Sequence, residues 1–143
     1  RADVVVVGAH EQLTYDEIRI AAQAVRRGAE LIGATRDATF PMPDGPWPAS
    51  GAVLAAIETA AGRTADRIAG KPEPPMYEAA RDRLGAGRCL GVGDRLEIDV
   101  LGARRAGMDS ALVLTGGATR AEAEAAEHRP THVADSLAAL VLQ

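Results

Sequence analysis

Several residue types are scarce in this chain, and each scarcity excludes a class of protein. The single cysteine, Cys89, rules out an internal disulfide and indicates a buried thiol in a reducing compartment, which favours the cytoplasm. One tryptophan, two tyrosines, one phenylalanine and a net charge of −4 leave neither stacking surfaces nor a basic stripe for nucleic acid. No apolar run approaches the length of a membrane span. We therefore expect neither a nucleic-acid partner nor a membrane partner.

Lysine is also scarce, since Lys71 is the only lysine among 16 cationic residues. Its ammonium group is compact and movable, whereas the guanidinium group of arginine is a planar fork. A lone lysine in Gly70-Lys71-Pro72 therefore suggests a dedicated site. Farther along the chain Asp94 follows an apolar run, and Asp99 comes close behind.

What the chain does contain is enough to build a soluble globular core. It has 143 residues, of which 47% are hydrophobic and 25% charged. Apolar β-branched runs alternate with helical periods, a pattern typical of an α/β fold with a mostly parallel sheet. The predicted strands are residues 3–8, 31–34, 88–92, 111–114 and 132–133.

The predicted helices lie between these strands and have recognisable start and stop signals. Thr14 with Glu17 forms a capping-box pattern, Thr119 begins another helix, and Ser50 and Asp135 stand at the starts of two more. The predicted helices cover residues 15–28, 52–61, 74–84, 96–106, 120–127 and 136–142.

Residues 35–50 differ from the rest, because they carry four prolines together with Phe40 and Trp47. This composition predicts a stiff, irregular loop. The loop is either a lid that faces a substrate or a crossover whose aromatic side chains tuck against the core, and composition slightly favours the crossover. A domain boundary is expected between Gly62 and Arg67, which gives domains of residues 1–65 and 66–143.

The chemistry concentrates in the segment Gly93-Asp94-Arg95-Leu96-Glu97-Ile98-Asp99. Ligands of parallel sheets gather at the carboxyl ends of strands, where Asp94 is expected to offer oxygen to a hard cation such as Mg²⁺. Asp99, in the first turns of the next helix, would support that ligand. The alternative is that Asp94 only caps the helix while Arg95, Glu97 and Asp99 form a solvated face.

Other ligand motifs do not fit this sequence. A dinucleotide fingerprint would need a third glycine where Leu96 stands, and no Walker loop is present because Pro72 follows Lys71. The three histidines have neither cysteine neighbours nor the spacing of a zinc site.

Several segments share a pattern known from one superfamily. They are residues 70–76, 91–100, 102–107 and 112–117. These segments resemble the haloacid dehalogenase (HAD) superfamily, and more narrowly its subfamily IIA with a C2-type cap. That subfamily includes the 4-nitrophenyl phosphate, pyridoxal phosphate and phosphoglycolate phosphatases and the NagD-like proteins. Residues 34–62 are similar to the second half of such a cap.

The resemblance implies a fold and a reaction. Residues 1–65 would be the carboxyl-terminal half of the cap, and residues 66–143 the carboxyl-terminal half of a HAD-like Rossmannoid core. The reaction would be Mg²⁺-dependent hydrolysis of small phosphorylated metabolites through an aspartyl-phosphate, with a homodimer formed through the cap. Asp94 would bind the metal, and Lys71 and Asp99 would be catalytic. Asp37, Phe40 and Lys71 would contact the substrate.

One element of the family pattern is absent. The motif Asp-x-Asp-Gly-Thr, which carries the nucleophile, does not occur in these residues. We therefore expect the chain to be the carboxyl-terminal portion of a longer phosphatase and to be inactive alone. The alternative is a non-catalytic α/β module that binds phosphate or a partner.

Overall fold

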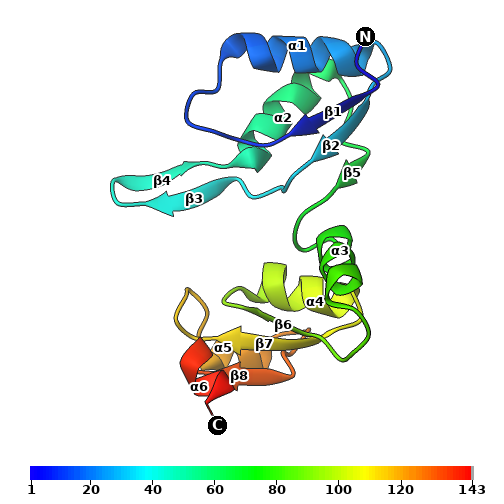
Figure 1. Ribbon diagram of the computed structural model, residues 1–143. Coiled ribbons are helices and arrows are strands. Elements are labelled where there is room, and N and C mark those ends of the chain that lie inside the picture. The colour runs from blue at the N-terminus through cyan, green and yellow to red at the C-terminus, as the bar shows by residue number, and fades with distance from the viewer. Residues whose placement is uncertain (143) are drawn as a thin grey trace. The chain divides into compact units, whose positions relative to one another are not determined.

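The computed structural model describes residues 1–142, which form parallel sheets with flanking helices. The predicted α/β class is confirmed. The chain divides into two compact units, Arg1–Gly70 (unit one) and Lys71–Gln143 (unit two) (Figure 1). The division falls a few residues beyond the predicted boundary. No helix of the described part is both long and apolar enough to cross a membrane.

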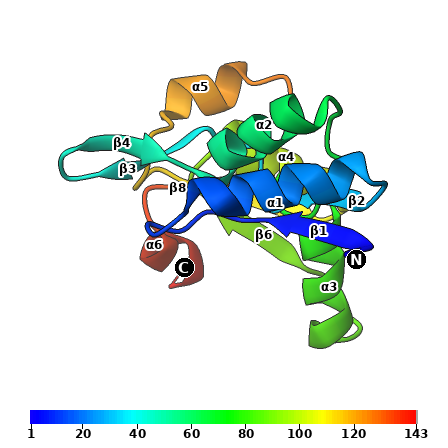
Figure 2. The same ribbon diagram turned by 90° about the horizontal axis from the view of Figure 1, so that it is seen from above.

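Unit one contains a parallel sheet, two long helices and a hairpin. Its elements are β1 (Val4–Val7), α1 (Tyr15–Arg26), β2 (Glu30–Gly33), β3 (Thr39–Met42), β4 (Gly45–Pro48), α2 (Ser50–Ala61) and β5 (Arg67–Ile68). The sheet order is β1-β2-β5, and α1 and α2 lie side by side against it (Figure 2).

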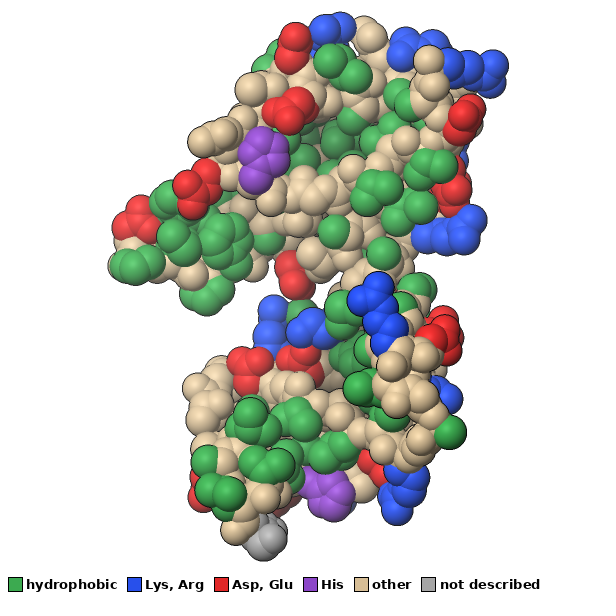
Figure 3. Space-filling model, in the orientation of Figure 1, with side chains coloured by type: hydrophobic (Ala, Val, Ile, Leu, Met, Phe, Trp, Pro, Cys, Tyr) green, Lys and Arg blue, Asp and Glu red, His purple; other side chains and the backbone are tan. Residues whose placement is uncertain are grey.

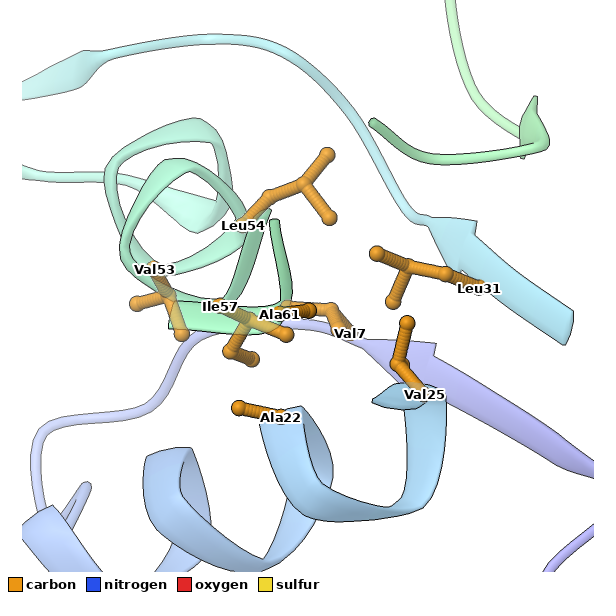
Figure 4. Close-up of a cluster of buried hydrophobic side chains, with 8 residues drawn as sticks. All are labelled: Val7, Ala22, Val25, Leu31, Val53, Leu54, Ile57 and Ala61. Atoms are coloured by element: carbon orange, nitrogen blue, oxygen red, sulfur yellow. The ribbon is translucent and has the colours of Figure 1, made fainter. Parts of the chain in front are cut away.

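The core of unit one is the apolar contact between these two helices and the sheet. Figure 4 shows side chains from α1, α2, β1 and β2 that point toward one another. Leu31 and Leu54 are fully buried, and each such side chain stabilises the fold by roughly 1.5–3 kcal/mol. The cluster comprises Val7, Ala22, Val25, Leu31, Val53, Leu54, Ile57 and Ala61.

The two unit-one helices begin in different ways. Thr14 and Glu17 form the predicted capping box at the start of α1. The cap expected at Ser50 is wrong, because α2 begins after Ala49 and has no side-chain cap. Instead, the amide of Gly51 donates to the carbonyl oxygen of Asp37 at 2.8 Å, so a neighbouring loop satisfies the helix end.

The prediction of an irregular loop at residues 35–50 is wrong. Residues 39–48 form the antiparallel hairpin β3–β4, in which Phe40 pairs with Trp47 across the strands. Pro43 and Asp44 make the turn, and Gly45, which begins β4 and pairs with Met42, has a φ of 122° that favours glycine. Proline is tolerated because this ribbon has only two strands, so each strand keeps an edge without ladder bonds.

Unit two is a second parallel sheet, in the order β6-β7-β8. Its elements are α3 (Pro75–Leu84), β6 (Leu90–Gly93), the π-helical turn η1 (Leu96–Val100), α4 (Leu101–Arg105), β7 (Asp109–Val113), α5 (Arg120–Ala125), β8 (His132–Ala134) and α6 (Leu137–Val141). Val100, Leu112 and Ala123 form its buried centre.

Three sequence-based expectations for unit two need correction. The single helix predicted over residues 96–106 is the π-helical turn η1 followed by α4. The predicted cap Asp135 is wrong, because Ser136 accepts the hydrogen bond from the amide of Ala139 at the start of α6. Cys89 lies just before β6 and is only partly buried.

Candidate active site

Asp94 directly follows β6, at the carboxyl end of the unit-two sheet. Because β6 and β7 run parallel, with Gly93 beside Leu112, the loops after both strands meet at this end. The loop after β7 contains Gly116, and a Cβ atom on that glycine would lie 1.9 Å from Oδ2 of Asp94. The Asp94 carboxylate is therefore held against the backbone of a second loop.

Asp99 lies in η1 and is only 6% exposed. Its Oδ2 accepts hydrogen bonds from the backbone amides of Asp94 at 3.3 Å and Arg95 at 3.1 Å. The carboxylate also fills the space beside Gly93, where an added Cβ would lie 2.2 Å from the Asp99 side chain. Asp99 thus fixes the backbone that carries Asp94.

Lys71 completes the cluster from a distant part of the sequence. Its Nζ donates to Oδ1 of Asp99 at 2.6 Å, while the lysine side chain keeps 43% of its surface exposed. The hydrogen bond to Asp99 raises the pKa of the Lys71 ammonium, against the opposing effect of partial burial. The structure therefore brings together Lys71 and Asp99, and connects Asp99 to the backbone of Asp94.

The burial of Asp99 argues against the alternative of a solvated face. Arg95 and Glu97 do form an exposed ion pair at 2.9 Å, as that alternative expects. Asp99 instead points inward, and the residue at the start of η1 is Arg95 rather than Asp94. The Asp94 side chain is therefore not required as a helix cap.

The side chains at the carboxyl end of the unit-two sheet are compatible with a magnesium ion that keeps most of its bound waters. Within residues 1–142, no group of three or more His, Cys, Asp or Glu side chains forms a metal cluster. Mg²⁺ is commonly bound through one or two carboxylates, with waters and substrate phosphate completing the octahedron. Asp94 can supply one such oxygen.

Asp37 and Phe40, two of the three predicted substrate contacts, lie in unit one, whereas the third, Lys71, lies in unit two. The backbone amide of Asp37 donates to the hydroxyl of Thr35 at 3.0 Å, and its carbonyl receives the amide of Gly51. Gly51 is required there, because a Cβ on it would lie 2.4 Å from the carbonyl oxygen of Arg36. The Asp37 loop is therefore fixed against the start of α2.

Phe40 stands on the hairpin, where hydrophobic side chains gather at the surface (Figure 3). Its ring contacts Trp47 edge to face with a centroid separation of 6.4 Å, and Phe40 remains 39% exposed. The indole of Trp47 donates to Asp44 at 2.8 Å. The aromatic side chains therefore pair with each other on the hairpin.

A cavity of about 710 Å³ opens beside this aromatic pair. Its wall is mainly apolar, with polar side chains from the loop that precedes α1. The lining residues are Ala9, His10, Glu11, Gln12, Leu13, Phe40, Trp47, Pro48 and Val53. Unit one thus offers an apolar hollow next to Phe40, one of the three predicted substrate contacts.

Sequence reasoning missed two residues of the unit-two cluster. Gly116 was part of a recognised pattern, yet nothing in the sequence told which side chain it faces. Tyr77 had no signal beyond its position in a helix after Lys71, although its hydroxyl donates to the backbone carbonyl of Asp99 at 3.1 Å. Both contacts depend on the tertiary fold.

Comparison with known proteins shows the family to which the chain belongs. Residues 68–140 match the family described as HAD-hydrolase-like. The chain belongs to this family. The predicted resemblance to HAD phosphatases is thereby confirmed, because the similar proteins include named phosphatases as well.

Three of these HAD-like relatives illustrate the similarity. The sugar-phosphatase AraL of Bacillus subtilis is 39% identical over 138 residues, which cover 95% of this chain and 50% of AraL. The crystal structure of a 4-nitrophenylphosphatase from Thermotoga maritima has a TM-score of 0.90 and 38% identity, covering 100% of this chain and 56% of the other. A glycerol phosphate phosphatase from Mycobacterium tuberculosis, solved in complex with magnesium, has a TM-score of 0.91 and 39% identity, with coverages of 98% and 43%.

The alignments also compare the length of this HAD-like chain with the lengths of its relatives. It spans about half the length of the relatives it matches. The relatives' activities therefore belong to proteins roughly twice as long as this 143-residue chain.

Proposed function

We propose that the complete protein containing these residues is a Mg²⁺-dependent phosphatase that hydrolyses small phosphorylated metabolites through an aspartyl-phosphate intermediate. The observation that carries this proposal is the ion pair of Lys71 and Asp99, whose carboxylate also holds the backbone of Asp94 at the carboxyl end of β6. The names of the related proteins support the same reaction class.

Each residue of this cluster has a distinct task. Asp94 would hold Mg²⁺, and the ion would neutralise charge on the phosphate and on the nucleophile. Asp99 keeps the Lys71 ammonium in place and protonated by accepting its hydrogen bond. Lys71 then offsets the repulsion between a phosphate and a carboxylate nucleophile. Phosphoryl transfer is mostly positioning and charge stabilisation, so these tasks account for a large share of the catalysis.

The nucleophile comes from outside these 143 residues. No Asp-x-Asp pair occurs in the sequence, and the relatives that match are about twice as long. Residues 66–143 accordingly form the carboxyl-terminal half of the HAD-like core, and residues 1–65 the corresponding half of the cap. The 143-residue chain alone is inactive in this account.

The cap half supplies two of the three substrate contacts and the dimer interface. Asp37 and Phe40 face the organic part of the metabolite, and the apolar hollow beside Phe40 favours an apolar or small group there. A homodimer forms through the cap. The scarcity of cysteine fits a reducing compartment, so we place the protein in the cytoplasm.

The experiment that tests this proposal compares the complete protein with the 143-residue chain. Both are assayed on 4-nitrophenyl phosphate with and without Mg²⁺. We expect turnover only by the complete protein and only with the metal. Equal turnover by the 143-residue chain would refute the missing nucleophile, and phosphate binding without hydrolysis by the complete protein would favour a non-catalytic module.

Lys71→Met in the complete protein tests the role of the ammonium group. The substitution keeps a long unbranched side chain and removes the charge, so we expect kcat to fall about a hundredfold or more. Arg81→Met, at another cationic position in unit two, is the control for loss of a positive charge. A Lys71→Met enzyme with wild-type turnover would exclude this lysine from the reaction.

A further inference from the structure

Tyr77 contacts the same short turn that carries Asp99, but from a different helix. It lies on α3, and its hydroxyl donates to the backbone carbonyl oxygen of Asp99 at 3.1 Å. Asp99 therefore has two kinds of partner: its carboxylate holds Lys71 and two amides, and its carbonyl accepts the phenol. The orientation of the carboxylate depends on the turn that this carbonyl belongs to.

The ring of Tyr77 lies beside two glycines, and one of them, Gly102, leaves the space that the ring occupies. A Cβ on Gly102 would lie 2.6 Å from the ring, and one on Gly91 would lie 3.7 Å from it. Gly102 is in α4 and Gly91 is in β6, so the ring bridges the helix and the strand on either side of η1. Because the ring is confined in this way, its hydroxyl is directed at the Asp99 carbonyl.

The η1 turn has π-helical hydrogen bonding rather than the regular bonding of an α-helix. In η1 the amide of Val100 donates to the carbonyl of Arg95, a π-type bond, while the amide of Asp99 donates to the same oxygen. Single π turns are rare and occur often at functional sites. A hydrogen bond from outside the helix fixes such a turn without requiring regular helical geometry.

We propose that Tyr77 is a positioning residue, whose hydroxyl holds the η1 turn so that the Asp99 carboxylate stays aligned with Lys71. This inference rests on the proposed function where it concerns turnover. Burial raises the pKa of the Tyr77 phenol, with the negative charge of Asp99 adding to the effect, so the hydroxyl remains a donor at neutral pH.

The test compares Tyr77→Phe with Tyr15→Phe in the complete protein. Tyr15 is the only other tyrosine of this chain and is 83% exposed, so it controls for the same chemical change at an uninvolved position. One readout does not require activity: acetic anhydride labels unprotonated amines, and trypsin releases residues 68–81, in which Lys71 is the only lysine. The labelling rate of Lys71 is then measured by mass spectrometry.

We expect Tyr77→Phe to lower the pKa of Lys71 and so to speed Lys71 labelling at pH 8 by about threefold, and Tyr15→Phe to leave the rate unchanged. For hydrolysis, we expect Tyr77→Phe to lower kcat about fivefold or more at nearly constant KM, since small displacements of positioned groups are costly. Unchanged labelling and unchanged kcat in Tyr77→Phe would overturn the role of Tyr77.

Two further outcomes keep this inference separate from the proposed function. If the wild-type protein hydrolyses no phosphate ester but Tyr77→Phe still exposes Lys71, the phosphatase proposal fails and the positioning role stands. If Tyr77→Phe lowers the melting temperature while the labelling of its folded state matches wild type, the tyrosine is only a packing residue and the inference is wrong.

Discussion

Glycine at position 116 determines where the Asp94 carboxylate can lie. The Asp94 side chain occupies the space that a Cβ at Gly116 would need, with 1.9 Å between that Cβ and Oδ2. The next residue, Gly117, has nothing within 4 Å of an added Cβ. Two adjacent glycines in one loop thus have very different neighbours.

This difference predicts unequal effects of two alanine substitutions in the complete protein. Gly116→Ala must displace either the loop or the carboxylate, so we expect the Mg²⁺ concentration for half-maximal activity to rise about tenfold or more. Gly117→Ala, the matched control, should leave that concentration unchanged. A Mg²⁺ titration of turnover makes the comparison, and equal behaviour of the two variants would contradict the placement of Asp94.

The pairing of Lys71 with Asp99 gives a second residue-scale prediction. Asp99 raises the pKa of Lys71 by accepting its hydrogen bond, so the stabilisation from the pair is fully present at neutral pH. This contribution of Lys71 is lost as the pH rises through its raised pKa. We expect Asp99→Asn to lower the pKa of Lys71, measured from the pH dependence of Lys71 labelling.

Asp82→Asn serves as the control for that measurement, because Asp82 is an exposed aspartate on the same helix as Tyr77. Asp82→Asn should leave the pH dependence of Lys71 labelling unchanged. A Lys71 pKa that is the same in wild type and Asp99→Asn would show that the ion pair does not form in solution.

At the scale of elements, Glu58 connects the end of α2 to two neighbouring segments. Its side chain is 13% exposed, and it accepts two hydrogen bonds from Arg36, at 3.0 and 3.3 Å, and one from the amide of Ala65 at 2.7 Å. The hydrogen bonds from Arg36, with that from Ala65, lower the pKa of Glu58 against the effect of burial. The ionised carboxylate therefore holds the loop between β2 and β3 against α2.

Glu58→Gln is expected to reduce the free energy of unfolding at pH 7 by about 1–3 kcal/mol, the usual range for a hydrogen bond to a charged group. Because the pKa of Glu58 is lower in the folded state, its contribution is present above the unfolded value and is lost as the pH falls through the folded value. The difference in unfolding free energy between wild type and Glu58→Gln should therefore become smaller below about pH 4. Urea unfolding at several pH values measures this difference.

Glu11→Gln, at an exposed glutamate of the same unit, is the control and should change the unfolding free energy by less than about 0.5 kcal/mol. A constant gap between wild type and Glu58→Gln from pH 7 to pH 3 would show that the ionised carboxylate is not the group that stabilises α2.

Elements with local signals were the ones that the sequence predicted well. The predicted capping box at Thr14 and the predicted cap at Thr119 each depend on residues within four positions, and both are present. The π turn η1 and the short strand β5 have no such signal, because each depends on contacts with distant residues. The β3–β4 hairpin was missed because the four prolines of residues 35–50 were interpreted as an irregular loop.

At the scale of the whole molecule, the candidate active site shows the same difference between features with a local sequence signal and features that depend on distant contacts. Asp94 could be placed at a strand end from sequence alone, since the apolar run and Gly93 mark the end of β6. The contact between Lys71 and Asp99 spans 28 residues, and the family resemblance named both as catalytic without predicting that they touch. The roles of Lys71, Asp94, Asp99, Asp37 and Phe40 remain predictions.

The measurement that tests the central claim most directly is phosphate release by the complete protein with Asp94→Asn. Asparagine keeps the size of the side chain and removes the charge that a hard cation requires. We predict that wild type releases phosphate from 4-nitrophenyl phosphate only with Mg²⁺. The Asp94→Asn protein should lose nearly all turnover at every Mg²⁺ concentration, while Asp82→Asn behaves as wild type. Undiminished, Mg²⁺-dependent release by Asp94→Asn would contradict the account.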